Sequence, residues 1–262
     1  MSQLKHFLLR SAVTLLFLAV PVLGVWTFVK AEDWHVWFPP YVTTYGESID
    51  FLFYVILWMV AITFVVTEGA LVYFILRYAR KDESHASYTH GNHTLELVWT
   101  AIPALLLVFI AISQMKTWAT VKLNFPKEGP YTAERPLMEV YGSQFDWRVR
   151  YPDPQGNFQG ADVIEVPYDI YVPVDTKVVL RLKSRDVIHS FFVPRFRLKQ
   201  DAVPGMNIPV WFEATETGDY DLICAELCGW GHFKMAGRIH VLEKDEFERW
   251  LADQRAALYR TD

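Results

Sequence analysis

The sequence contains few cysteines and no excess of positive charge. Only two cysteines occur in 262 residues, which excludes a framework of several disulfide bonds. The formal net charge is -5 at pH 7, so we do not expect nucleic-acid binding through neutralisation of phosphates. A polar, low-complexity composition is also absent, because 52% of the residues are hydrophobic and 16% are aromatic. The chain is therefore not an intrinsically disordered polypeptide.

The long apolar runs lie before residue 117, and the first of them is Ser11–Val29. It has no charged residue and follows Lys5 and Arg10. As a helix it would be about 28 Å long, close to the thickness of the hydrocarbon core of a membrane. A cleavable signal peptide is the alternative, but its apolar core usually has only about 7–15 residues. The length favours a retained helix and leaves the signal peptide open.

Two further apolar segments, Phe51–Leu76 and Leu95–Met115, predict a transmembrane hairpin. Arg77, Arg80 and Lys81 follow the first of these two segments. Basic residues collect on the cytoplasmic side of short loops, so this loop lies inside and the C-terminal part of the chain lies outside. This orientation does not depend on whether the preceding segment is cleaved.

We therefore expect three parts. Residues 1–40 form a signal peptide or an additional transmembrane helix with a periplasmic linker, 41–120 form the hairpin, and 121–262 form an exported domain. Such a multi-pass topology without a transit peptide favours a bacterial inner membrane. Glu68 lies within the second apolar segment. Because an ionisable group is expensive there, we expect it to pair with a partner subunit.

The exported part consists of short runs rich in β-branched and aromatic residues, which predict a small β-sandwich or barrel. Strands do not alternate with helices as in a parallel α/β sheet. A final helix is indicated by the spacing of apolar residues after Glu243. The expected strand runs are Met138–Tyr151, Val163–Val174, Lys177–Lys183, Ile188–Val193, Ile208–Ala214, Tyr220–Ile223 and Gly237–Leu242.

The residues with the most distinctive chemistry lie in the run CAELCGWGHFKM at 224–235. Thiolate and imidazole ligands select copper over hard cations, and a weak axial Met is typical of copper electron-transfer sites. Zinc sites more often combine a Cys-x2-Cys pair with a second Cys or His pair. His189, after a strand-like run, is the candidate for the further imidazole. Alternatives are a Cys224–Cys228 disulfide and a thioredoxin-fold copper chaperone, which would leave Met235 without a role.

Three more motifs accompany this run. They are NHTLELVWTAIPA at 92–104, SRDVIHSFFVP at 184–194 and KQDAVPG at 199–205. With the cysteine motif, and in this order, they resemble subunit II of the haem–copper cytochrome c oxidases. The resemblance extends from about Tyr41 to Trp250.

The resemblance implies a cupredoxin Greek-key sandwich with a dinuclear copper centre, CuA. In this pattern Cys224 and Cys228 bridge both copper ions, and His189 and His232 ligate one ion each. Met235 and the backbone carbonyl of Glu226 are weak axial ligands. The Glu226 side chain helps to bind magnesium against subunit I.

The resemblance also assigns Glu96 to the cytoplasmic entrance of a proton pathway into subunit I. The predicted topology places this residue at the inner end of the third apolar segment. The alternative is a carboxylate near a helix N-terminus, where the helix dipole favours negative charge. We favour the functional interpretation, because ionisable groups at membrane depth tend to mark proton routes.

The chain departs from the family where electrons are expected to arrive. The family usually has GHQWYW before the core of the sandwich, with its first Trp accepting electrons, whereas residues 142–147 read GSQFDW. Phe145 stands in place of that Trp, and Trp147 matches the later one. Asp186 matches an acidic docking position. Arg148 and Arg150 occupy a stretch that is acidic in oxidases that dock a basic cytochrome c. We therefore expect an acidic cytochrome or a permanently associated respiratory complex as the donor.

The expected function is the electron-accepting subunit of a terminal oxidase that reduces O₂ to water and translocates protons. Haems and CuB would lie in the partner subunit, so this chain catalyses nothing alone. A CuA-bearing nitric oxide reductase subunit and a copper-delivery protein are the alternatives. A quinol oxidase subunit would lack the copper ligands. We interpret His85, His90 and His93 as a polar loop, and His240 as a structural residue.

Overall fold

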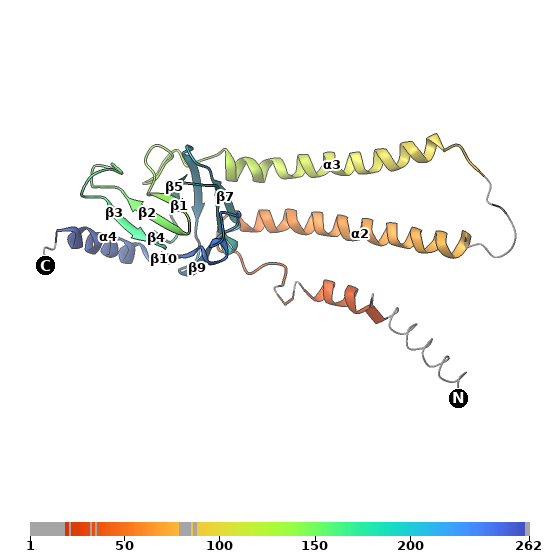
Figure 1. Ribbon diagram of the computed structural model, residues 1–262, viewed down its shortest axis with the longest axis horizontal. Coiled ribbons are helices and arrows are strands. Elements are labelled where there is room, and N and C mark those ends of the chain that lie inside the picture. Colours follow the sequence, from red (N-terminus) through yellow and green to blue (C-terminus); the bar gives the residue numbers. More distant parts are fainter. Residues whose placement is uncertain are drawn as a thin grey trace, which may run out of the picture.

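The computed structural model describes residues 19–20, 22–31, 33–34, 36–78, 85 and 88–259. Figure 1 shows a β domain from which two long helices, α2 (Gly46–Tyr78) and α3 (His93–Lys122), extend side by side. Residues 19–20 and 22–30 are helical, which agrees with the end of the first predicted segment. The rest of that segment, with Lys5 and Arg10, lies outside the described residues, as do Arg80 and Lys81.

Helices α2 and α3 are long and apolar enough to cross a membrane, and their apolar stretches bury no residue within the chain. Both helices extend beyond the predicted segments. The apolar pattern marks only the part within the hydrocarbon core, and a helix continues through the polar boundary. Asn92 caps α3, because its side-chain oxygen accepts hydrogen bonds from the backbone N–H of Thr94 and of Leu95, at 3.0 and 3.1 Å.

The β domain consists of two five-stranded sheets, which confirms the predicted sandwich. The first sheet has the order β3-β2-β1-β5-β8 and the second β4-β10-β9-β6-β7. Two pairs, β1·β5 and β4·β10, are parallel, and the others are antiparallel. The strands are β1 (Met138–Ser143), β2 (Asp146–Tyr151), β3 (Ile164–Pro167), β4 (Asp169–Pro173), β5 (Lys177–Ser184), β6 (His189–Val193), β7 (Leu198–Ala202), β8 (Ile208–Glu213), β9 (Gly218–Cys224) and β10 (Ala236–Leu242).

Three strand predictions need correction. The run Met138–Tyr151 is two strands, because the chain turns between Ser143 and Asp146. The run 163–174 is also two strands, β3 and β4, which belong to different sheets; Tyr168 between them has a left-handed φ of 66°. Strand β7 was not predicted, because its sequence LKQDA is mostly polar. It is an edge strand, paired within its sheet only with β6.

The predicted C-terminal helix is present as α4 (Lys244–Leu258). It covers one end of the sandwich (Figure 1) and buries Phe247. The ring of Trp250 stacks on Tyr171, with 4.2 Å between ring centroids, and meets the edge of Tyr151 at 5.1 Å. Such aromatic contacts contribute about 0.5–1.5 kcal/mol each beyond their buried area. The helix therefore belongs to the domain core.

The chain that leads into α2 is bound to the sandwich. The backbone N–H of Val42 donates to the carbonyl of Arg195 at 2.9 Å, and Thr43 forms a β-bridge with Ala214. The Tyr45 ring packs against Trp211. At least three backbone and aromatic contacts thus fix the start of α2 on the β domain.

Candidate metal centre

Three strands bring the predicted ligands to one end of the second sheet. Strand β9 ends at Cys224, β10 begins just after Met235, and β6 begins at His189. The pairing of β6 with β9 places Phe191 opposite Cys224. The loop between β9 and β10 closes on itself, because the N–H of Cys224 donates to the carbonyl of Met235 at 3.0 Å. A short 3₁₀ helix, η2 (His232–Lys234), forms its last part.

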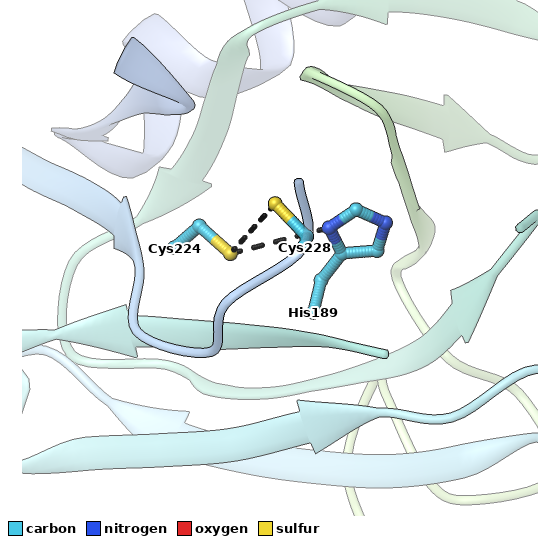
Figure 2. Close-up of side chains that lie close together, drawn as sticks. All are labelled: His189, Cys224 and Cys228. Atoms are coloured by element: carbon cyan, nitrogen blue, oxygen red, sulfur yellow. Dashed lines mark hydrogen bonds between the residues drawn. The ribbon is translucent and has the colours of Figure 1, made fainter. Parts of the chain in front are cut away.

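The sulfur and imidazole atoms of the predicted site lie together. The Sγ atoms of Cys224 and Cys228 are 3.9 Å apart, and His189 Nδ1 is 4.0 Å from Cys224 Sγ. Figure 2 shows the two thiols and this imidazole pointing toward one another. His232 Nδ1 and Met235 Sδ lie 3.7 and 3.8 Å from Cys228 Sγ. The structure thus brings these five side chains together.

The arrangement fits a thiolate-bridged copper site. Both cysteines are free, so they do not form the disulfide considered as an alternative. Metal–thiolate bonds are about 2.3 Å long, and one ion can therefore contact both sulfurs across the observed 3.9 Å. The backbone carbonyl oxygen of Glu226 is 3.3 Å from Cys224 Sγ. Two thiols, two imidazoles and one thioether form a soft donor set of the kind that selects copper.

The ionisation of the thiols depends on burial and on the neighbouring groups. Burial raises the pKa of Cys224, but hydrogen bonds with His189 and with the backbone at Glu226 outweigh it and lower this pKa to about 6. Burial and the adjacent Cys224 charge raise the pKa of Cys228 to about 11. The protein thus favours one thiolate, and the cationic metal must favour the second.

His189 is held in place from two sides. Its Nε2 lies 2.7 Å from Asp186 Oδ1, so Nδ1 is directed to the thiols. Such a carboxylate partner fixes the orientation of a ligating imidazole. On the other side Gly142 approaches the ring so closely that a Cβ there would lie 2.8 Å from His189 Cδ2. Neither the spacing of residues nor their chemistry revealed the role of Gly142.

The β1–β2 turn supports the loop between β9 and β10, residues 224–235, which we call the metal-binding loop. The side-chain amide of Gln144 donates to the carbonyl of Cys228. Phe145 lies against Gly231, where an added Cβ would come within 2.4 Å of its Cδ2. Sequence reasoning missed Gln144, although its position next to the altered Phe145 could have drawn attention to it.

Trp147 occupies a different place from the one expected of a docking residue. Its side chain is fully buried, and its ring centroid is 6.1 Å from that of His189 and 5.7 Å from that of Phe191. A buried side chain cannot touch a donor protein. Trp147 thus packs against His189, whereas Phe145 is half-buried beside the loop between β9 and β10.

The remaining predicted residues lie away from the thiols. The Glu226 side chain is exposed, and Glu96 lies in the first turn of α3, 3.2 Å from His93 Nδ1. Glu68 is exposed on α2. His240 Nδ1 is 2.6 Å from Asp219 Oδ1, as suits a structural residue. Among the described residues, His189, Cys224 and Cys228 form the only cluster of potential metal ligands.

Known proteins share both halves of this architecture. Residues 138–242 match the family model described as cytochrome c oxidase subunit II, periplasmic domain. Residues 31–117 match the transmembrane domain of the same subunit.

Individual relatives cover most of the chain. A cytochrome c oxidase subunit 2 from Thermostichus vulcanus is 31% identical over 270 residues, which cover 85% of this chain and 80% of the relative. An alternative cytochrome c oxidase subunit 2 from Bradyrhizobium diazoefficiens is 27% identical and covers 93% of this chain and 92% of its own length. The solved periplasmic domain of subunit II from Bradyrhizobium japonicum is 29% identical over 46% of this chain and 94% of that domain, with a TM-score of 0.41.

These similarities include the hairpin, the sandwich and the loop with the thiols. They favour the oxidase subunit over the copper-delivery protein and the nitric oxide reductase subunit. With its two apolar helices and its cupredoxin-like domain, the chain belongs to the cytochrome c oxidase subunit II family.

Proposed function

We propose that this chain accepts electrons for a haem–copper terminal oxidase at a dinuclear copper centre, CuA, held between β9 and β10. The observation that carries the proposal is the buried pair of free thiols, 3.9 Å apart and flanked by two imidazoles and a thioether. When bound, such a centre accepts and donates single electrons. The oxidase as a whole reduces O₂ to water and translocates protons.

Each ligand has a proposed role. Cys224 and Cys228 would supply thiolate ligands to the copper, and His189 and His232 would each supply an imidazole. Met235 and the Glu226 carbonyl would supply weaker ligands. The ligands come from the ends of paired strands, and Asp186 together with Gly142 confines His189. This rigid support would limit the movement of the ligands when the bound copper gained or lost an electron, which would favour fast transfer.

The two membrane helices indicate where the partner subunit binds. The apolar stretches of α2 and α3 are not buried within the chain. We assign one side of this helix pair to the contact with oxidase subunit I, which carries the haems and CuB. The exposed Glu226 carboxylate would bind magnesium at that interface. Glu96 would lie at the cytoplasmic entrance of the proton pathway, with the β domain on the periplasmic side of a bacterial inner membrane.

The donor is a cytochrome c or a cytochrome-bearing respiratory complex. Arg148 and Arg150 both form ion pairs within the β domain. Arg148 Nε lies 2.8 Å from Asp146 Oδ2, and Arg150 Nε lies 2.7 Å from Glu165 Oε2. Because both arginines are paired with carboxylates, they give little net charge for steering a donor of either sign. Selection of the donor must therefore depend on other surface features.

Metal analysis of the purified complex tests the proposal. We expect two copper ions per chain in this subunit, and we expect Cys228→Ser to abolish the dinuclear absorption and electron paramagnetic resonance spectra. Met235→Leu should alter these spectra, whereas Met206→Leu, at an exposed position outside the loop, should not. A Cys224–Cys228 disulfide in the working complex would refute the proposal.

A further inference from the structure

The metal-binding loop exposes an unusual amount of apolar surface. Leu227, Trp230 and Phe233 are 77%, 79% and 84% exposed. These are the three most exposed large apolar side chains among residues 124–259, all of which the structure describes. Single exposed apolar residues are ordinary, but several on one short loop indicate an interaction surface. We call these three residues the apolar loop.

Trp230 is held in a fixed place on this loop. Its ring meets the edge of Phe145, with 5.3 Å between centroids and 70° between ring planes. Lys234 Nζ lies 4.7 Å from the centroid of the Trp230 ring. The close contact of Phe145 with Gly231 leaves no space between the β1–β2 turn and the loop. The indole is therefore ordered although it is exposed, and ordering it costs a partner little entropy.

The position of Trp230 suits the transfer of an electron. Trp230 lies two residues from Cys228 and two residues from His232 along the chain. Electron-transfer rates fall steeply with distance, so a donor that contacts this indole would reach the ligands by a very short path. Tryptophan is also among the residues most enriched at the energetic centre of protein interfaces.

The charges around the apolar loop limit the kind of partner. Lys234 lies over the Trp230 ring and forms no ion pair within the described residues. Asp186, the nearest conventional docking carboxylate, is already engaged by His189 and by the backbone N–H of Gln144. The apolar loop thus carries one cation, Lys234, over its indole, and one exposed carboxylate, Glu226, beside Leu227.

We propose that Trp230, supported by Phe145, is the docking contact of a haem donor protein whose exposed cofactor edge is apolar and has a carboxylate opposite Lys234. This inference rests on the proposed function. In the step itself, the donor's reduced haem iron loses one electron and the copper centre gains it, and no bond or proton changes place. Apolar contact supplies most of the affinity, and Lys234 supplies orientation.

The test measures donor binding as well as electron transfer in the intact oxidase. The probes are an acidic and a basic c-type cytochrome, and binding of each is followed by surface plasmon resonance. Trp230→Ala should raise the Kd of the acidic cytochrome about tenfold or more, and Trp230→Phe should largely retain binding. Tyr259→Ala removes an aromatic side chain of similar exposure (68%) just after the end of α4 and should leave the Kd unchanged. Lys234→Glu should shift preference toward the basic cytochrome.

A small reductant separates this inference from the proposed function. Hexaammineruthenium(II) needs no docking surface, so it should reduce wild-type protein and Trp230→Ala equally fast. If it reduces no copper in the wild type, the proposed function fails. If it reduces both proteins but Trp230→Ala binds the acidic cytochrome as tightly as the wild type does, the docking proposal is overturned. Loss of the catalytic subunit from purified Trp230→Ala would also overturn it, because the loop would then be a subunit interface.

Discussion

The Arg197 guanidinium and the Asp50 carboxylate join the β domain to the beginning of α2. Arg197 Nη2 lies 2.8 Å from Asp50 Oδ2 and 2.7 Å from the carbonyl oxygen of Pro39. The guanidinium also lies over the ring of Phe38, 4.4 Å from its centroid. The Arg197 side chain is only 4% exposed. His189 is the first residue of β6, and the strand ends about 13 Å away, four residues before Arg197. Because Arg197 pairs with Asp50 at the start of α2, this ion pair helps to orient His189 relative to the membrane helices.

Removing one partner of this ion pair should destabilise the protein strongly. We expect Arg197→Gln to lower the free energy of unfolding by about 3 kcal/mol, because it leaves a largely buried carboxylate without its cation. Urea unfolding of the detergent-solubilised chain measures the loss. Asp50→Asn combined with Arg197→Gln should lose less than the two single variants added together. The exposed pair Lys30–Asp33 is the control, and Lys30→Gln should cost well under 1 kcal/mol. Additive losses at Asp50 and Arg197 would contradict the coupling.

Gly142 should be required for copper binding rather than for folding. An alanine Cβ would lie 2.8 Å from Cδ2 of His189, whose ring is fully buried and has no space to retreat. Overpacking of this kind costs about 1–3 kcal/mol, so Gly142→Ala should weaken copper binding roughly tenfold while the circular dichroism of the sandwich persists. Competition with a copper chelator measures the affinity. Gly69→Ala, where an added Cβ meets nothing within 4 Å, is the control. Unchanged copper affinity in Gly142→Ala would show that His189 is not confined as described.

Asp186 should act through His189. Loss of a carboxylate that orients a ligating imidazole typically weakens metal binding about 10–100-fold, and we expect a loss in this range for Asp186→Asn. The same chelator competition measures it, and a shift of the copper absorption bands should accompany it. Asp146→Asn removes a nearby carboxylate that pairs with Arg148 instead and should have no such effect. Equal effects of both substitutions would indicate a general change of charge.

The sequence predicted the parts of the fold that are governed by local pattern. The long apolar runs predicted α2 and α3, and the β-branched runs predicted most strands of the sandwich. The metal-binding loop was predictable because four of its ligand residues are close in sequence and chemically distinctive. His189 was found from the family resemblance and from its place after a strand-like run.

The residues that were missed act through tertiary contacts. Gly142 has no side chain that could mark it, and its role arises only from the register that places β1 beside β5 and close to His189. Strand β7 is an edge strand with a mostly polar sequence, so its pairing with β6 has no strong local signal. Trp147 matched a family motif, but the motif does not record that the side chain lies inside the sandwich. For Gly142 and Trp147 the deciding contact is with His189, which is more than 40 residues away in the sequence.

Glu139 should make the stability of the β domain dependent on pH. Its side chain is 3% exposed and lies 2.7 Å from Lys183 Nζ and 2.9 Å from Arg181 Nη1, while the Tyr141 hydroxyl donates to it at 2.6 Å. Burial raises the pKa of Glu139, but the hydrogen bonds from Lys183 and Tyr141 outweigh it, and this pKa lies below the ordinary value of 4.5. A depressed carboxyl pKa stabilises the fold at pH values above the unfolded-state pKa. That contribution is lost as the pH falls through the lower, folded-state pKa.

Comparison of Glu139→Gln with the wild type tests this dependence. At pH 7 the variant should lose about 1–3 kcal/mol of unfolding free energy, because two cations lose a buried partner. The difference between the two proteins should begin to shrink as the pH falls below about 4.5, where the carboxyl group of the unfolded chain is protonated, and should vanish as the pH falls through the lower, folded-state pKa. Urea unfolding at several pH values between 7 and 3.5 measures it. Glu165→Gln, at a side chain that is 34% exposed and paired with arginines, should cost less than about 1 kcal/mol. A loss at Glu139 that stays constant down to pH 3.5 would show that packing, and not charge, accounts for its contribution.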